Sequence, residues 1–126
     1  MRRALFALVF LAGCPDPEQP EVELYAITNA PPASRAVVVN DTHNDNYSIE
    51  LSTGVAIAAQ CWSSCNSTCM PIVTVSDGAL LEVRPVFRAN GSKSEVALIA
   101  KRPGTATLRV DSGCATRTYY LSVVPR

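Results

Sequence analysis

The sequence contains no apolar run long enough to cross a bilayer as a helix. Its longest such run, Ala4 to Ala12, has about nine apolar positions, whereas a spanning helix needs roughly twenty. The chain also has no excess of positive charge, because its 11 Lys and Arg residues balance 11 Asp and Glu residues. This balance argues against a nucleic-acid partner, which would require a basic patch.

Motifs for catalysis and for redox exchange are also missing. The single histidine, His43, has no partner at a metal-motif spacing. Ser63, Ser64 and Ser67 lie in no nucleophile elbow, so no catalytic triad is indicated. The CxxC pattern of thiol-exchange enzymes is absent as well. We therefore expect a protein that is not an enzyme and that carries neither a metal nor an organic cofactor.

The short apolar run at the N-terminus has the features of a signal segment. Two arginines precede the run, and it ends in Leu-Ala-Gly-Cys at residues 11–14. This ending resembles the lipobox of bacterial lipoproteins, in which small residues let a peptidase cut the bond before the cysteine. The resemblance implies that residues 1–13 are removed and that Cys14 becomes an acylated N-terminus. Several acyl chains give lasting membrane attachment. The alternative is an ordinary secretory signal that leaves Cys14 as a free thiol.

After that cleavage the chain has a tether and one domain. Loss of residues 1–13 lowers Lys plus Arg from 11 to 9 against 11 acids, which gives a net charge of about −2. The tether, residues 14–21, reads Cys-Pro-Asp-Pro-Glu-Gln-Pro-Glu and predicts a stiff, solvated segment. The remaining residues, 22–126, have the length of one ordinary domain and show no internal repeat.

Alternation of apolar and polar residues is the main pattern of this domain. It is clearest at residues 47–51, 105–110 and 119–123, and a period of two is the period of a strand with one buried face. Residues 53–60 contain alanines that would suit a short helix, but their apolar residues also alternate, which favours a strand. Turn clusters separate these runs, at residues 29–32, 40–46, 76–78, 90–92, 103–104 and 111–113. The sequence therefore predicts an all-β sandwich.

Residues 96–110 resemble part of a known family. They look like the strand, turn and strand near the end of group 2 bacterial Ig-like domains, the invasin and intimin type. Residues 75–83 resemble the family's Ser-Asp turn and following strand, and residues 119–124 resemble its closing strand. The family's tryptophan is absent near Val73, and residues 84–95 are longer than the usual link. The resemblance implies one all-β, Ig-like sandwich with Greek-key topology and about seven strands, and it implies a role in surface interactions. The matching motif positions are Leu98, Ala100, Gly104, Thr105, Ala106 and Leu108.

Four cysteines remain when Cys14 is set aside: Cys61, Cys65, Cys69 and Cys114. An exported chain meets an oxidising compartment, so we expect two disulfides, for which three pairings are possible. If residues 55–60 and 105–110 are the second and penultimate strands, the loops that follow them lie at the same end of the sandwich. Every pairing places one bridge within the triplet and one between the triplet and Cys114. The strand order adds the expectation that Cys114 lies beside the cysteine loop. Zinc or an iron–sulfur cluster is the alternative, although the ligand spacing is unlike that of structural zinc sites.

Two further features could belong to a site. His43 lies between Asp41 and Asp45, which could be metal ligands, but Asn and Asp at this density more often form a turn by bonding their own backbone. Trp62, which lies among the cysteines, could be an exposed ligand anchor. Aromatic residues at the base of a loop more often cover the end of a core, and we expect that role.

Together these features predict a lipid-anchored protein of the bacterial cell envelope. Its expected role is that of a non-catalytic structural, adhesive or binding module. Its expected partners are the membrane, through the lipid on Cys14, and an envelope protein or glycan. The outer membrane is favoured over the inner one, although Pro15 and Asp16 are ambiguous sorting cues. The alternative is a small ligand-binding or metal-binding envelope protein that uses the loop from Cys61 to Cys69.

Overall fold

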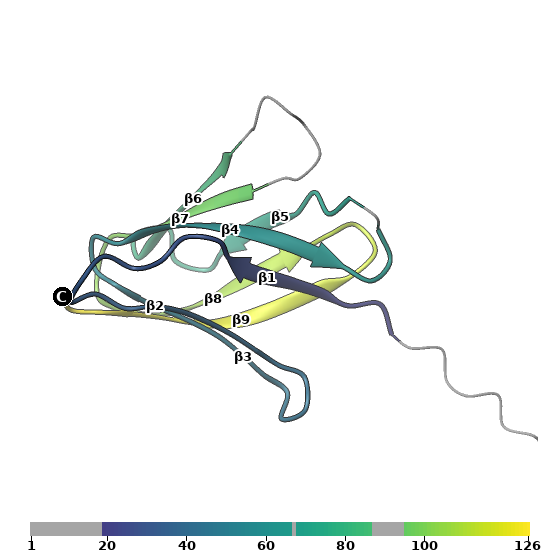
Figure 1. Cartoon of the computed structure of the whole chain (residues 1–126), viewed down its shortest axis with the longest axis horizontal. Helices are drawn as coiled ribbons and strands as arrows, with labels where there is room; N and C mark the ends of the chain where they lie inside the picture. The colour runs from purple at the N-terminus through teal and green to yellow at the C-terminus, as the bar shows by residue number, and fades with distance from the viewer. Residues whose placement is uncertain (1–18, 67, 87–94) are drawn as a thin grey trace, which may run out of the picture.

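Nine strands form two facing sheets in the part of the chain that the computed structural model describes, residues 19–66, 68–86 and 95–126 (Figure 1). The first sheet has the strand order β1-β4-β7-β6, and the second has the order β2-β3-β9-β8-β5. The strands are β1 (Val22–Ala26), β2 (Ala36–Asp41), β3 (Asn46–Ser52), β4 (Ala56–Ser63), β5 (Ile72–Val75), β6 (Leu81–Val86), β7 (Glu95–Ala100), β8 (Gly104–Asp111) and β9 (Thr116–Val124).

Several predicted features lie outside the described residues. These are the signal segment 1–13, Cys14 with the tether as far as residue 18, Ser67, and the turn at residues 90–92. Within the described part of the chain, no helix is of a length and apolarity that would cross a bilayer.

The strand order is that of an immunoglobulin fold. β1, β4, β7 and β6 occupy the places of the four-stranded sheet of a constant-type Ig domain, and β5, β8 and β9 occupy those of the three-stranded sheet. The β2–β3 hairpin is an addition between the first two Ig strands, and β3 joins the second sheet by pairing in parallel with β9. The predicted fold class, an all-β Ig-like sandwich, is therefore confirmed. The hairpin accounts for nine strands in place of about seven.

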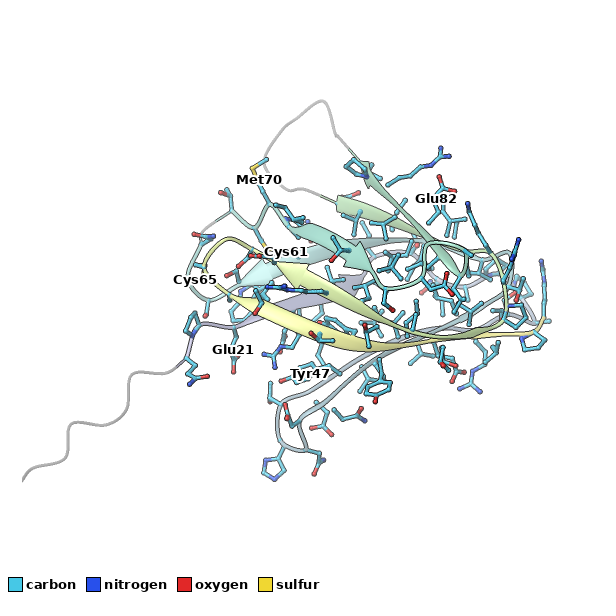
Figure 2. The ribbon with its side chains drawn as sticks, turned by 180° about the vertical axis from the view of Figure 1, so that it is seen from behind. Glu21, Tyr47, Cys61, Cys65, Met70 and Glu82 are labelled. Atoms are coloured by element: carbon cyan, nitrogen blue, oxygen red, sulfur yellow. A yellow bond between two sulfur atoms is a disulfide. The ribbon has the colours of Figure 1, made fainter. Side chains whose placement is uncertain are left out.

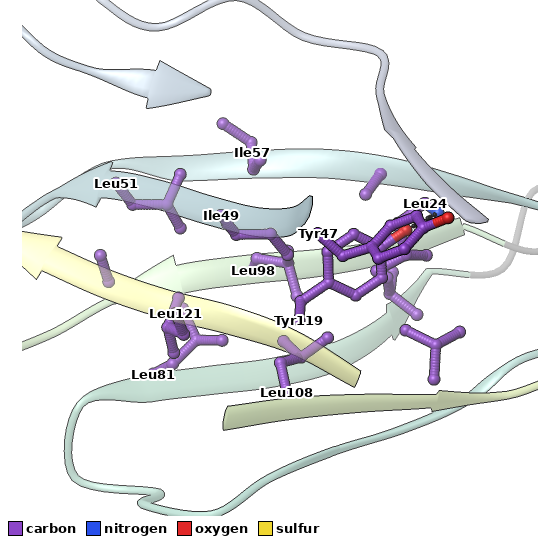
Figure 3. Packing of buried hydrophobic residues seen from close by; sticks show 14 of the residues in the cluster. Leu24, Tyr47, Ile49, Leu51, Ile57, Leu81, Leu98, Leu108, Tyr119 and Leu121 are labelled. Carbon is purple, nitrogen blue, oxygen red and sulfur yellow. Dashed lines mark hydrogen bonds between the residues drawn. The ribbon is translucent and has the colours of Figure 1, made fainter. Parts of the chain in front are cut away.

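The core lies between the sheets, where the inward-facing positions of the alternating strands meet (Figure 3). Ile49 on β3 is paired with Leu121 on β9, and Leu108 on β8 with Tyr119 on β9. Leu24, Ile57 and Leu98 lie across from them on the first sheet, and each is at most 2% exposed. Each such side chain contributes about 1.5–3 kcal/mol on burial, so the core is the main source of stability.

The turn between β7 and β8 depends on Gly104. Its φ angle is +151°, a value that residues other than glycine rarely adopt. A Cβ atom at this position would lie 3.0 Å from Leu80 Cδ2. The backbone N–H of Lys101 donates to the carbonyl of Leu80 at 2.7 Å, which fixes this turn against the β5–β6 connection. Gly104 therefore sits where the chain needs close packing.

Candidate functional site: the disulfide-bearing end and the hollow beside it

Two disulfides brace the end of the sandwich at which β1 begins. Cys61, near the end of β4, is bonded to Cys69, with the Cα atoms 5.6 Å apart. Cys65, in the connection to β5, is bonded to Cys114, in the β8–β9 turn, with the Cα atoms 6.3 Å apart. Both spacings are ordinary for disulfides. The structure thus selects one of the three pairings that the sequence left open.

Hydrogen bonds join the same two loops. The Asn66 side-chain N–H donates to the Ser112 carbonyl at 2.9 Å, and the Ser63 and Ser112 hydroxyl oxygens lie 3.4 Å apart. On the other side, the backbone N–H of Ser64 donates to the Glu21 carbonyl at 2.9 Å, and the Glu21 N–H donates to the Ser64 hydroxyl at 2.8 Å. The cysteine loop is therefore held to both the start of β1 and the β8–β9 turn.

An open hollow of about 890 Å³ lies beside this loop. Figure 2 shows Glu21, Cys61 and Cys65 together at this end of the molecule. We call it the β1–β4 hollow, and its walls are Glu21, Glu23 and Tyr25 on the β1 side, and residues 60–66, 68 and 69 on the β4 side.

Strand register places four of these residues on the outer face of the first sheet. Glu23 is paired with Trp62, and Tyr25 with Gln60. The alternate residues on β1, Val22 and Leu24, are fully buried in the core, so Glu23 and Tyr25 lie on the opposite face. The result is a patch of two aromatic rings, one carboxylate and one amide, because directly paired side chains are neighbours.

The patch combines exposed rings with a buried carboxylate. Trp62 is 47% exposed and Tyr25 is 46% exposed, whereas Glu23 is only 7% exposed. The Tyr25 hydroxyl donates a hydrogen bond to Glu23 Oε2. This bond, with a smaller contribution from burial, raises the pKa of Tyr25 to about 12. The hydroxyl therefore stays protonated at neutral pH, and the bond holds both side chains in place.

The hollow carries negative charge. Its described walls contain two carboxylates, those of Glu21 and Glu23, and no Lys, Arg or His. The other polar groups facing it are uncharged amides and hydroxyls, including those of Gln60, Asn66 and Thr68. Such a surface favours neutral or cationic ligands over anionic ones.

The structure corrects the expected role of Trp62. We expected its ring to cover the end of the core, but Trp62 lies on the outer face of the first sheet opposite Glu23 and is about half exposed. The physical reason is the alternation of β4, which directs Cys61 and Ser63 inward and Trp62 outward.

The structure also brings in Tyr25, Gln60 and Glu23, which the sequence analysis did not identify. The signal for them was present, since Glu23 and Tyr25 are two residues apart, as are Gln60 and Trp62. Two such pairs share a face if their strands are neighbours. The missing information was the pairing of β1 with β4, which is known only once the tertiary structure is known.

The segment around His43 is a turn at the tip of the β2–β3 hairpin, which projects from the body of the sandwich (Figure 1). The Asp41 carboxylate accepts hydrogen bonds from the backbone N–H groups of His43 and Asn44, both at 3.1 Å, and from the Asn44 side chain at 2.8 Å. These bonds, the one from the Asn44 side chain first, hold the pKa of Asp41 below its usual value. The carboxylate is used to organise the turn.

The described residues contain no group of three His, Cys, Asp or Glu side chains that could hold a metal ion. The four sulfurs of the cysteine loop and Cys114 are joined in pairs, so none of them is a thiolate ligand in this structure. A zinc site would therefore require the reduced chain.

Comparisons with known proteins give little beyond the fold. No protein-family model matches the chain, and no curated protein matches its sequence. Among solved structures, the crystal structure of domains 4 and 5 of the S-layer protein SbsC is similar, with 14% sequence identity and a TM-score of 0.46. The match covers 83% of this chain and 53% of that one, so this chain spans about half of the SbsC structure. A likeness at this level carries no functional information.

Proposed function

We propose that this chain is a bacterial envelope lipoprotein that acts as a non-catalytic binding or structural module. Cys14 carries the lipid, residues 14–21 form the tether, and residues 22–126 form the Ig-like domain outside the cytoplasm. The observation that carries the proposal is the leader itself: Arg2 and Arg3, a short apolar run, and Leu-Ala-Gly-Cys at residues 11–14.

The disulfides support the extracytoplasmic part of the proposal. Disulfides persist in oxidising compartments and are rare in the cytosol. The chain has two of them at one end of a small domain, and one closes a separation of 49 residues. In the chain-entropy model a bridge that closes a loop of this length contributes about 4 kcal/mol, so a compartment that keeps the bridge formed would stabilise the domain.

The outer face of the first sheet supports a role in binding. Ig-like sandwiches use loops and exposed faces to contact partners, and the same fold serves many functions. The β1–β4 hollow lies on such a face. Of the two alternatives, a ligand-binding and a metal-binding envelope protein, the hollow favours the ligand-binding one.

Mass spectrometry of the membrane-extracted protein tests the anchor. We expect a mature chain that begins at Cys14 and carries acyl groups, located mainly in the outer-membrane fraction of a density gradient. A Cys14→Ser variant is the matched control and is expected to keep residues 1–13 and to carry no lipid. A native chain found in the cytosol with its leader uncut would overturn the proposal.

A further inference from the structure

We propose that the β1–β4 hollow is a saccharide-binding site. Trp62 and Tyr25 pack against the apolar faces of sugar rings, while Glu23 and Gln60 bond to their hydroxyl groups. This inference deepens the proposed function by naming the class of ligand that the module binds. The binding itself follows from the hollow and does not depend on the lipid anchor.

The two aromatic rings provide the surface that sugar rings require. A pyranose has a face of C–H groups, and the face of an aromatic ring carries partial negative charge that attracts them. Trp62 and Tyr25 are diagonal neighbours in the β1–β4 pair, each about half exposed, and both line the same hollow. An isolated exposed aromatic residue is ordinary, but two rings beside fixed polar groups form a recognition surface.

Glu23 and Gln60 provide hydrogen-bonding groups beside the two rings. Burial of a carboxylate is unfavourable unless the carboxylate is hydrogen-bonded, and Glu23 meets this need through the Tyr25 hydroxyl. A carboxylate is a strong acceptor for sugar hydroxyls, and the Gln60 amide offers both a donor and an acceptor. The ligand therefore meets a carboxylate that is already oriented, with an amide beside it.

The disulfides make the remaining wall of the hollow rigid. Cys61 and Cys69 form one bridge and Cys65 forms the other, and all three residues line the hollow. Asn66 is held by its hydrogen bond to the Ser112 carbonyl at 2.9 Å. Less conformational entropy is lost on binding when a site is already ordered, so an open site of this size can still bind with useful affinity.

Charge narrows the class of ligand. Because the described walls carry two carboxylates and no basic side chain, phosphorylated or acidic sugars are disfavoured and neutral or amino sugars are favoured. A small organic cation could also use aromatic rings and a carboxylate. However, Glu23 is already bonded to Tyr25, and the uncharged amides and hydroxyls around it suit a polyhydroxylated ligand better.

The position of the hollow agrees with an envelope glycan as the source of the sugar. The hollow lies at the end of the sandwich where β1 begins, and the C-terminus lies at the opposite end (Figure 1). Val22 is eight positions after Cys14, and eight fully extended residues span at most about 29 Å. If Cys14 is lipidated, the hollow samples carbohydrate close to the membrane surface. This step alone rests on the proposed function.

The single tryptophan gives a direct assay, because Trp62 is the only one in the chain. The intact protein in detergent is titrated with cellotetraose, with chitotetraose and with its deacetylated, amino-sugar form, and tryptophan emission is followed. We expect a saturable change with at least one of these oligosaccharides. Choline, as a small organic cation, serves as the comparison probe. A response to choline with none to the sugars overturns the proposal, as does the absence of any saturable response.

Variants locate the site by isothermal titration calorimetry with the oligosaccharide that binds. Trp62→Ala and Gln60→Ala are each expected to lower the affinity about tenfold or more. Tyr120→Ala is the matched control, because Tyr120 is 75% exposed on the second sheet, and its affinity should stay within about twofold. Equal losses in Tyr120→Ala and Trp62→Ala overturn the proposal.

Far-UV circular dichroism establishes that each variant is folded. Trp62→Phe, which keeps an aromatic ring, should lose less affinity than Trp62→Ala. Acylation of Cys14 is measured separately by mass spectrometry, so a failure to bind oligosaccharides would not contradict the proposed lipid anchor.

Discussion

The hydroxyl of Tyr119 in β9 accepts a hydrogen bond from the backbone N–H of Leu24 in β1, at 2.8 Å, and so joins the two sheets. The same hydroxyl donates to the Asn40 side-chain carbonyl, and the Asn40 side-chain N–H donates to the Leu24 carbonyl at 2.8 Å. Leu24 belongs to an edge strand, whose backbone groups would otherwise lack partners on one side. Two side chains from the second sheet therefore cover the edge of the first at the strand that carries Glu23 and Tyr25.

Removal of this hydroxyl should destabilise the fold. Tyr119→Phe leaves the Leu24 N–H and the Asn40 carbonyl without their buried partner, so we expect a loss of about 1–3 kcal/mol in the free energy of unfolding. Urea unfolding followed by circular dichroism measures it. Tyr120→Phe is the matched control, because Tyr120 is 75% exposed, and its effect should be within about 0.5 kcal/mol. Equal effects of the two substitutions would show that the hydroxyl of Tyr119 contributes nothing.

The same residue should make the fold sensitive to alkali. Burial raises the pKa of Tyr119 from 10.0 to about 12, which favours its neutral form in the folded state. The stabilisation from this shift is fully present below pH 10, the unfolded pKa, and is lost as pH rises toward 12. We therefore expect the unfolding free energy of the wild type to fall between pH 10 and 12 more steeply than that of Tyr119→Phe. If the unfolding free energies of the two proteins fell in parallel with pH, the ionisation of Tyr119 would not be the cause of the sensitivity to alkali.

The Glu23–Tyr25 bond makes a separate spectroscopic prediction. Because this bond is the main reason that the pKa of Tyr25 is raised to about 12, Glu23→Gln should lower the pKa of Tyr25 toward its ordinary value of 10.0. Ultraviolet absorbance of tyrosinate measures the change, with Tyr25→Phe identifying the titration step that belongs to Tyr25. A Tyr25 titration that is the same in Glu23→Gln and in the wild type would show that the carboxylate does not act on the phenol.

The sequence predicted the core of the β-sandwich because its strands alternate. Residues 105–110 and 119–123 show one apolar face each, and they lie in β8 and β9. β2 has a different pattern: Val37, Val38 and Val39 are consecutive, and no residue of the strand is fully buried. A run of that kind carries no periodic signal, so the extra hairpin was not predicted.

The candidate site could be predicted only in part for a related reason. The cysteines, Trp62 and the turn around His43 each stand out in the sequence by residue type. Glu23 and Gln60 do not, because an acid or an amide on a strand is ordinary until its neighbours are known. Pairing across β1 and β4, between residues about 35 to 40 positions apart, is what brings these groups together.

Substitution of Gly104 tests whether the backbone at this position requires glycine. Gly104→Ala should destabilise the domain by about 1–3 kcal/mol, because alanine is strained at a φ angle of +151° and its Cβ would press on Leu80 at 3.0 Å. Gly78→Ala is the matched control, since a Cβ there meets nothing within 4 Å and the φ angle is ordinary. Thermal unfolding compares the two. Equal stabilities would show that neither the φ angle nor the contact with Leu80 requires glycine at this position.

The two disulfides should contribute unequally to stability. In the chain-entropy model, a bridge stabilises the fold by restricting the unfolded chain, and the effect grows with the length of the loop it closes. Cys65–Cys114 closes a separation of 49 residues and should contribute about 4 kcal/mol, whereas Cys61–Cys69 closes a separation of 8 and should contribute about 2.5 kcal/mol. Double serine variants of each pair, compared by urea unfolding, measure the difference. A larger loss from the short loop would mean that packing around Cys69, which is 8% exposed, outweighs chain entropy.

Because both bridges also line the β1–β4 hollow, the Cys61→Ser, Cys69→Ser variant should weaken oligosaccharide binding even where the protein remains folded.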